Sequence, residues 1–322
     1  MEYKIYDHKF EWRGNFLKAK NLVEQAFQEL GYKEGHGYSG NGWMVYNHTC
    51  RDNLYDGDNV IHDQILFVKP TAPTSNHFAI DDLGYANSSR LAFERPNDPE
   101  IMYSHLNPGG RESWDWNKIT KFIDQRTNKY DDHVLLKWVK SPTIVKDHIL
   151  ILGQMPDDEV INGFTFKGHW DRLKMIVDKL LPLNEPIVVK LHPAWNKTLK
   201  KVRDQAKPTL AKWREDPRIQ LIEGYVSIHD ILPHTRVAII DNSTSGIECL
   251  MHEVPVITYG HPEYHWATQK IQCLTQLRDF VIDLRWWDVD YSNKFIYWYI
   301  NDYLCYDLNS TIRRLDELIK ST

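Results

Sequence analysis

The chain has 322 residues, of which 42% are hydrophobic and 26% are charged, and this ordinary globular composition excludes a disordered chain or a fibre. Because single hydrophobic cores tend to stop growing near ~250–300 residues, the length predicts two domains. The formal net charge of -5 argues against a general nucleic-acid binder, which would carry a basic face.

Cysteine usage and hydropathy indicate a reduced, cytoplasmic protein. The four cysteines lie far apart without a CxxC spacing, so they predict neither a disulfide framework nor a zinc site. The N-terminal sequence MEYKIYDHKFEW lacks the apolar stretch of a signal peptide, and no apolar run approaches the ~20 residues needed to span a bilayer. The cysteines are Cys50, Cys249, Cys273 and Cys305.

The N-terminal part, residues 1–140, shows a less regular pattern. Apolar residues at helical spacing predict a helix over Phe16–Tyr32, and a second helix is expected near Trp114–Arg126. Short strand-like runs lie at Gly42–Tyr46, Gln64–Val68 and His77–Ile80. Together these elements predict an α/β domain, whose strand order the pattern leaves open.

From Lys146 the pattern becomes regular and predicts a second domain over residues 146–290. Five apolar runs are typical of buried strands: HILILG (148–153), PIVVKL (186–191), IQLIEG (219–224), RVAIID (236–241) and VPVITYG (254–260). Helical stretches lie between most of them, at His169–Leu181, Lys197–Glu215, Ile228–His234 and Ser245–His252. This alternation predicts a doubly wound parallel sheet, in which ligands bind outside the carboxyl ends of the strands.

Two further segments concern surfaces. The basic run Lys197–Lys212 is expected to be the solvated side of an amphipathic helix, and the alternative is a surface for an anionic membrane or a polymeric acceptor. The tail over residues 291–322 is predicted to be helical and to pack across both domains, and the alternative for its aromatic stretch YWYINDYL is an exposed patch.

The first predicted strand of the second domain ends in GQMPDDEV, which places Gln154, Asp157 and Asp158 in the following loop. A carboxylate at this edge can act as a nucleophile, a general base or a ribose anchor. Aspartate is also common as a helix cap or a turn former, so the loop alone leaves both interpretations open.

The second strand ends in Lys190-Leu191-His192-Pro193. Alternation along a strand puts Lys190 and His192 on the same side, and Pro193 ends the strand. A cation and an imidazole at this edge suit a ligand that carries phosphate and carboxylate groups. The alternative is a lysine that extends into solvent and a histidine that is hydrogen-bonded in the core.

The fourth strand runs into the polar segment Asn242–Ser245, which offers hydroxyl and backbone N–H groups to an anion at a helix N-terminus. Gly246 lets a ligand approach the backbone closely. Ser245 and Glu248 also match the S-x-x-E capping box, so helix initiation explains the same residues.

The fifth strand ends in TYGHPEYH, where His261, Glu263 and His265 do not have a metal-binding spacing. We therefore expect no metal ion and no cofactor. The sequence lacks GxxxxGK[ST], G-x-S-x-G and GxGxxG, which argues against a P-loop NTPase, an α/β-hydrolase and an NAD enzyme.

Taken in order, these strand ends resemble the capsular polysaccharide Kdo transferases of Gram-negative bacteria. The resemblance covers residues 148–265. The matching motifs are Q-x-x-x-D at Gln154–Asp158, K-x-H-P at Lys190–Pro193, T-S-x-x-G-F-E at Asn242–Glu248 with Asn for Thr and Ile for Phe, and G-x-P-x-Y at Gly260–Tyr264.

The resemblance implies a GT-B arrangement, in which two Rossmann-like domains face each other across a cleft. It also implies transfer of Kdo from CMP-Kdo to a saccharide or glycolipid acceptor, without a metal ion and with retention through an aspartyl intermediate. The implied catalytic residues are Asp158, the nucleophile, and His192, which together with Lys190 would hold the carboxylate and phosphate groups. The residues implied to bind the donor are Gln154, Lys190, Asn242, Ser243, Thr244, Ser245, Gly246, Glu248 and His261.

The N-terminal half carries a fainter likeness, since FAIDDLGYANSS (78–89) resembles the family's D-x-x-G-Y-Y segment. The acidic E-D-G-F-L-R-S stretch that precedes it in the family is replaced here by Phe67–Thr71, and the later tryptophan-rich loop by His265–Thr268. His77, Asp81 and Asp82 are the candidate acceptor-side residues.

Two other functions remain open at this stage. One is another GT-B transferase, or an epimerase, that uses a UDP-sugar; the other is a non-catalytic sugar-binding module on the same scaffold. The expected partners are a nucleotide sugar and an acceptor, without nucleic acid, and peripheral association with the inner face of the membrane is compatible with them.

Overall fold

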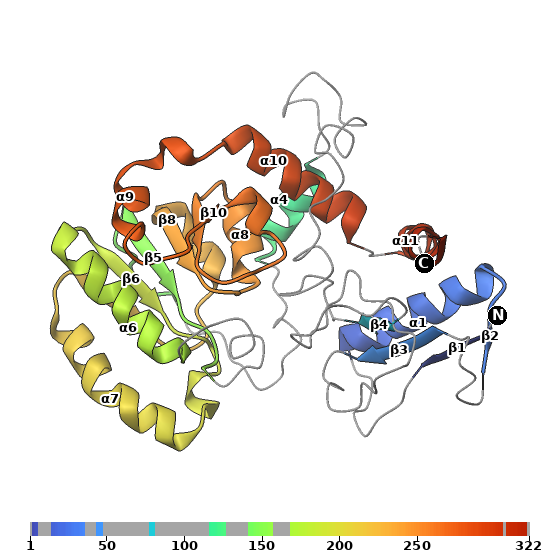
Figure 1. Ribbon diagram of the computed structural model, residues 1–322, viewed down its shortest axis with the longest axis horizontal. Coiled ribbons are helices and arrows are strands. Elements are labelled where there is room, and N and C mark those ends of the chain that lie inside the picture. The colour runs from blue at the N-terminus through green and yellow to red at the C-terminus, as the bar shows by residue number, and fades with distance from the viewer. Residues whose placement is uncertain are drawn as a thin grey trace. The chain divides into compact units, whose positions relative to one another are not determined.

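The computed structural model describes residues 2–5, 14–35, 43–47, 77–80, 116–126, 141–156, 168–304 and 307–320. The chain divides into two compact units, and each contains a parallel β-sheet (Figure 1). The first unit comprises residues 1–105 and 297–322, and the second comprises residues 106–296.

This division differs from the boundaries expected from the sequence. Helix α4 (Asn117–Asp124) contacts α8 (Ser245–Met251), so it belongs to the second unit and not to the N-terminal domain predicted over residues 1–140. The C-terminal tail is shared between the units, because the division falls between residues 296 and 297. The predicted packing of residues 291–322 across both domains stays a prediction.

The first unit contains a four-stranded parallel sheet of order β2-β1-β3-β4. The strands are β1 (Glu2–Ile5), β2 (Lys33–Glu34), β3 (Trp43–Asn47) and β4 (His77–Ile80). Strands β3 and β4 and helix α1 (Gly14–Glu29) confirm three predicted elements, whereas β1 was not predicted. The predicted strand Gln64–Val68 lies outside the described residues.

The described core of this unit joins the two ends of the chain. The rings of Tyr3 on β1 and Phe27 on α1 stack with centroids 4.7 Å apart. Helix α11 (Leu308–Lys320) packs against α1 and adds the buried side chain of Leu315 to the same cluster.

The second unit contains a six-stranded parallel sheet of order β10-β9-β8-β5-β6-β7. The strands are β5 (His148–Leu152), β6 (Ile187–Lys190), β7 (Ile219–Ile222), β8 (Thr235–Ile240), β9 (Val256–Thr258) and β10 (Gln269–Lys270). The five predicted strands and the doubly wound parallel sheet are confirmed. Strand β10 has two residues, too few to produce a periodic pattern.

The strand order decides where ligands can bind in this unit. The chain enters at β5, runs outward through β6 and β7, and returns to β8 on the other side of β5. The order in which strands are added to the sheet therefore reverses between β5 and β8. Doubly wound sheets bind ligands at such a point, in the crevice beyond the carboxyl ends of the strands.

Helices cover the two faces of this sheet (Figure 1). Helices α6 (His169–Leu180) and α7 (Lys200–Glu215) cover one face. Their buried tryptophans and aliphatic side chains form a core cluster with the odd-numbered residues of β5 and β6. Helix α8 contacts β8 and β9, and strand alternation turns the even-numbered residues toward its face. Helix α9 (Leu277–Ile282) also belongs to this unit, and α10 (Val289–Trp298) runs across its end at residue 296.

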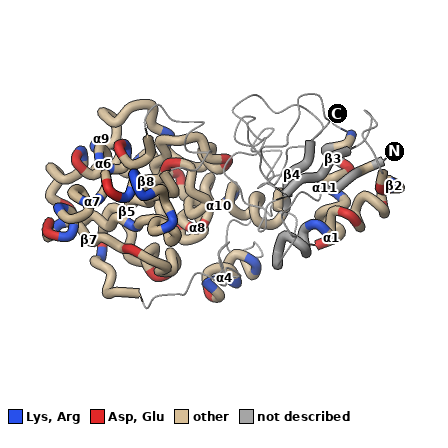
Figure 2. Tube along the Cα trace, turned by 90° about the horizontal axis from the view of Figure 1, so that it is seen from below, with Lys and Arg blue, Asp and Glu red and all other residues tan. Residues whose placement is uncertain are grey.

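Two local predictions have different outcomes. The basic stretch is the solvated side of an amphipathic helix, as expected, since α7 buries Ala206, Leu210 and Trp213 while Figure 2 shows lysine and arginine along it. The predicted helix Ile228–His234 is wrong, because the chain forms two short 3₁₀ turns there, and the proline at position 233 interrupts the segment. Among the described helices, none is both long and apolar enough to cross a membrane.

Candidate functional site

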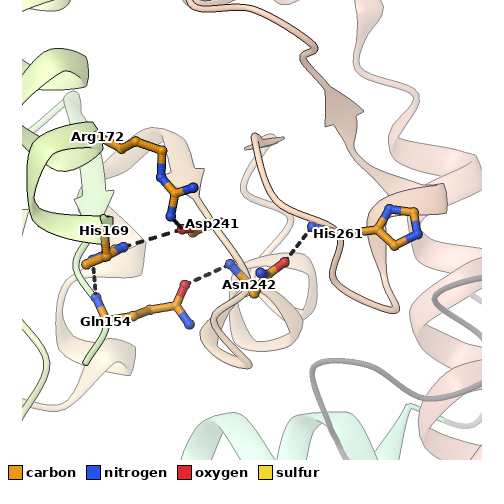
Figure 3. A network of polar contacts seen from close by, with 6 residues as sticks. All are labelled: Gln154, His169, Arg172, Asp241, Asn242 and His261. Carbon is orange, nitrogen blue, oxygen red and sulfur yellow. Dashed lines mark hydrogen bonds and ion pairs between the residues drawn. The ribbon is translucent and has the colours of Figure 1, made fainter. Parts of the chain in front are cut away.

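Polar residues from three loops meet at the carboxyl edge of the second sheet (Figure 3). Gln154 follows β5, Asn242 follows β8 and His261 follows β9. The main-chain N–H of Asn242 donates to Oε1 of Gln154 at 2.7 Å, and the main-chain N–H of His261 donates to Oδ1 of Asn242. The structure therefore brings together three of the predicted site residues, on both sides of the point where the winding reverses.

Gln154 is held a second time through its backbone. Its main-chain N–H donates to Nε2 of His169, the first residue of α6, at 2.8 Å. Behind it, Oδ2 of Asp241 accepts a bond from Nη2 of Arg172 at 2.6 Å and lies 3.4 Å from Nδ1 of His169. The buried Asp241 immediately follows β8.

The sequence analysis missed His169, Arg172 and Asp241. The available signals were weak, because an aspartate that ends an apolar strand is also a common turn former. His169 and Arg172 stand three residues apart at the start of a predicted helix, which places them on one face. That spacing alone does not reveal which strand the face meets.

Lys190 lies at the end of β6 on the face of the sheet that α8 covers. Its side chain is buried, with 7% exposed, and it has neither a hydrogen bond nor an ion pair within the described part of the chain. Burial lowers the pKa of its ammonium to about 8, and the negative charge of Glu248 on α8 opposes this shift. The site therefore holds a buried cation without a direct partner among these residues.

The segment Asn242–Glu248 begins α8 differently from the prediction. The predicted capping box is wrong by one position, because Thr244 is the N-cap and makes no side-chain capping bond. Instead, the hydroxyl of Ser243 accepts a bond from the main-chain N–H of Ser245 at 3.2 Å.

Glycines near this segment make room for protein atoms. A Cβ atom on Gly246 would collide with the ring of Tyr264, whose hydroxyl donates to the carbonyl oxygen of Ser243. A Cβ atom on Gly260 would collide with the side-chain oxygens of Asp241 and Asn242. The structure thus gives Gly246 a packing role against Tyr264.

The remaining predicted histidines lie in the loops after β6 and β9. Nδ1 of His192 accepts a bond from the main-chain N–H of Ala194 at 3.1 Å. The ring of His261 stacks on that of His265 with centroids 4.6 Å apart. The ammonium of Lys270 contacts Nδ1 of His261. Burial lowers the pKa of His265 to about 4, so its ring is neutral and donates from Nδ1 to the carbonyl oxygen of Pro262.

Several predicted residues lie beyond what the structure describes. Asp157, Asp158, Asp81 and Asp82 are outside the described residues, and His77 belongs to β4 without a described side chain. Over the described ranges, no group of three or more His, Cys, Asp or Glu side chains is arranged to hold a metal ion. The absence of a metal ion and a cofactor stays a prediction.

Comparisons with known proteins give a family. Residues 112–274, half of the chain, match the family model described as capsule polysaccharide biosynthesis protein. A comparison with curated protein sequences finds no match.

Solved structures give the fold. The chain is similar to the β-Kdo 2,4 transferase of KpsC from Thermosulfurimonas dismutans, with 17% identity, 98% of each chain covered and a TM-score of 0.51. The β-Kdo 2,7 transferase of that KpsC has 16% identity over 98% of this chain and 99% of its own, with a TM-score of 0.45. A glycosyltransferase from Rickettsia africae has 12% identity over 98% and 84%, with a TM-score of 0.42. The first likeness supports the predicted α/β fold of the GT-B type.

Proposed function

We propose, on the premise that the chain belongs to the capsule polysaccharide biosynthesis protein family, that it is a glycosyltransferase using a nucleotide-activated sugar. The family and the fold together support glycosyl transfer in capsule polysaccharide synthesis. In its finer form, the proposal is transfer of Kdo from CMP-Kdo to a saccharide or glycolipid acceptor. The likeness to a β-Kdo 2,4 transferase and the matching strand-end motifs motivate this donor.

The buried Lys190 is the observation that carries the proposal. Charged side chains inside proteins are normally paired, since burying an isolated charge is costly. Lys190 is not paired with any described residue, and it lies at the ligand-binding edge of a doubly wound sheet. An anionic ligand would supply the missing partner, and CMP-Kdo carries both a phosphate and a carboxylate.

The donor would lie along the ends of β5, β6 and β8. Lys190 and His192 would bind its phosphate and carboxylate as charge-assisted and neutral donors. Ser243 and Ser245 would contact the CMP phosphate, and Glu248 would accept hydrogen bonds from the ribose. Gln154, Asn242, Thr244, Gly246 and His261 would shape the surrounding loops.

The reaction would proceed in two displacements. First, the carboxylate of Asp158 attacks the anomeric carbon, the bond from that carbon to the phosphate oxygen breaks, and CMP leaves with the electron pair. An acceptor hydroxyl then attacks the same carbon, its proton passes to a base, and the bond to Asp158 breaks. Two inversions give retention of configuration. The candidates for the base are His77, Asp81 and Asp82.

The chemistry of the leaving group makes a metal-independent reaction reasonable. CMP departs as a single phosphate monoester, and a cation such as Lys190 can stabilise the charge that develops on it. We therefore propose that the enzyme needs neither a metal ion nor a cofactor. A location at the inner face of the membrane is likewise a prediction.

Intact-mass spectrometry with CMP-Kdo and no acceptor tests the donor and the mechanism together. We expect the wild-type protein to gain the mass of one Kdo residue at Asp158, and Asp158→Ala to gain none. Asp157→Ala is the matched control and should keep the adduct. An adduct at another residue would refute the aspartyl mechanism.

Thermal unfolding with nucleotides tests the donor class independently. A ligand at 100 times its Kd stabilises the folded state by about 2.7 kcal/mol. We expect such stabilisation from CMP and not from UDP. Stabilisation by UDP alone would contradict the CMP-sugar proposal and favour a UDP-sugar transferase or epimerase.

A further inference from the structure

A buried polar network lies directly behind the loop that begins at Gln154 (Figure 3). The side chains of His169 and Asp241 are fully buried, and that of Arg172 is 12% exposed. His169 and Arg172 come from the first turn of α6, whereas Asp241 follows β8. The network therefore joins a helix and a strand end on the two sides of the loop.

The hydrogen bonds determine which nitrogen of the His169 ring is the acceptor. A backbone N–H can only donate, so Nε2 of His169 must accept the bond from Gln154 at 2.8 Å. A neutral ring then carries its proton on Nδ1, which faces Oδ2 of Asp241 at 3.4 Å. The carboxylate thus orients the ring so that its acceptor nitrogen meets the Gln154 amide.

Arg172 fixes the carboxylate from the other side. Its Nη2 donates to the same oxygen of Asp241 at 2.6 Å, and its guanidinium lies 5.6 Å from the centre of the Tyr259 ring. The second oxygen of Asp241 is buried without a hydrogen-bond partner in the described part of the molecule.

Such a network is not the most stabilising set of side chains for a buried site. Apolar side chains of similar volume often stabilise a fold as well as a buried ion pair does, and an unsatisfied carboxylate oxygen adds a further cost. The network is instead well placed to control the loop, because Gln154 is held by its backbone here and by its side chain at Asn242.

We propose that His169, Asp241 and Arg172 are positioning residues, which hold Gln154 at the donor-binding edge of the second sheet. The inference rests on the proposed glycosyl transfer and adds three residues to it. None of the three needs to touch the sugar, because their effect passes through the Gln154 amide. Displacement of Gln154 would misplace the donor relative to the reacting groups, and this would lower kcat more than it raises the KM for the donor.

The test compares two substitutions of His169. His169→Leu removes the acceptor for the Gln154 N–H, whereas the side-chain oxygen of His169→Gln can replace Nε2. We expect kcat to fall about 10- to 100-fold in His169→Leu with little change in KM, and most of the rate to return in His169→Gln. Hydrogen exchange of the Gln154 amide should accelerate about tenfold in the leucine variant only.

His148→Leu is the matched control. His148 is also fully buried and hydrogen-bonded, with Nδ1 2.7 Å from the carbonyl oxygen of Val145, but it stands at the amino end of β5. Its loss should lower the melting temperature without accelerating hydrogen exchange of the Gln154 amide and without lowering kcat. Equal losses of kcat in His148→Leu and His169→Leu, or no recovery in His169→Gln, would overturn the positioning role.

The exchange measurement separates this inference from the proposed function. A wild-type protein inactive with CMP-Kdo would refute that donor, while unprotected Gln154 amides in wild-type protein would refute the network itself. Protection that is lost in His169→Leu and kept in His169→Gln supports the network whatever the donor is.

Discussion

The ammonium of Lys190 makes anion binding depend on pH. Its pKa of about 8 means that the side chain loses its charge when the pH rises above this value. We expect the affinity for CMP to fall as the pH is raised through about 8, because the deprotonated amine no longer attracts phosphate. Calorimetric titration of wild-type protein and Lys190→Arg measures this, since a guanidinium stays charged and should remove the dependence.

The pH dependence of the free energy of unfolding tests the lowered pKa of Lys190 without any ligand. A lysine in the unfolded chain has a pKa near about 10.4, so between about pH 8 and pH 10.4 the unfolded state binds more protons than the folded state. The free energy of unfolding should therefore rise over this range by up to about 3 kcal/mol relative to Lys190→Met. A constant difference between the two proteins across the range would contradict a lowered pKa.

The sequence predicted individual site residues unevenly. Gln154, Asn242 and His261 follow the first, fourth and fifth predicted strands of the second domain, and the structure connects them by hydrogen bonds. Asp241 was missed because its role depends on Arg172, which lies 69 residues away and belongs to a different element. Pairings of this kind follow from strand order, and strand order was not readable from local patterns.

At the scale of elements, the loop after β9 supports the start of α8. Tyr264 is fully buried against Gly246, and its hydroxyl donates to the carbonyl oxygen of Ser243. We expect Tyr264→Phe to lower the free energy of unfolding by about 0.5–1.5 kcal/mol, because the Ser243 carbonyl oxygen loses one of two donors and keeps the Gly246 N–H. Urea unfolding measures this change.

A second readout distinguishes local from global effects of Tyr264→Phe. Ser243 is a proposed phosphate contact, so loosening its loop should also weaken CMP binding. Phe280→Leu, in helix α9 on the core of the same unit, is the comparison for stability alone. Loss of stability without any change in CMP affinity would argue against a role for Ser243 in phosphate binding.

Element prediction succeeded where apolar runs were long and continuous. The five strands of the second sheet and the helices α6, α7 and α8 belong to this class. It failed at Ile228–His234, where helical spacing over a few residues competed with a proline, and at β10, which has only two residues. Short elements depend on tertiary contacts that a local pattern does not contain.

At the scale of the whole molecule, the last helix belongs to the unit that contains the first strand. Leu315 of α11 is buried in a cluster with Tyr3, Val23 and Phe27. We expect Leu315→Ala to lower the stability of the first unit by about 2–5 kcal/mol, because it leaves a cavity. Scanning calorimetry should show a lower transition temperature for that unit, whereas CMP should continue to stabilise the second unit.

Leu173→Ala provides the reciprocal experiment. Leu173 is buried in the core of the second unit, between α6 and the sheet. Its truncation should lower the transition that responds to CMP and leave the other transition in place. A single transition that shifts equally in both variants would show that the units unfold together.

The strand order has a consequence for how the protein is made. Strand β5 pairs on one side with β6, which follows soon after it, but on its other side with β8. Gln154 and Asn242 are 88 residues apart, so the ribosome must deliver most of the second unit before they can meet. Until then β5 has an unsatisfied hydrogen-bonding edge, which makes the growing chain vulnerable to aggregation. Translation beyond β8 both closes that edge and creates the crevice.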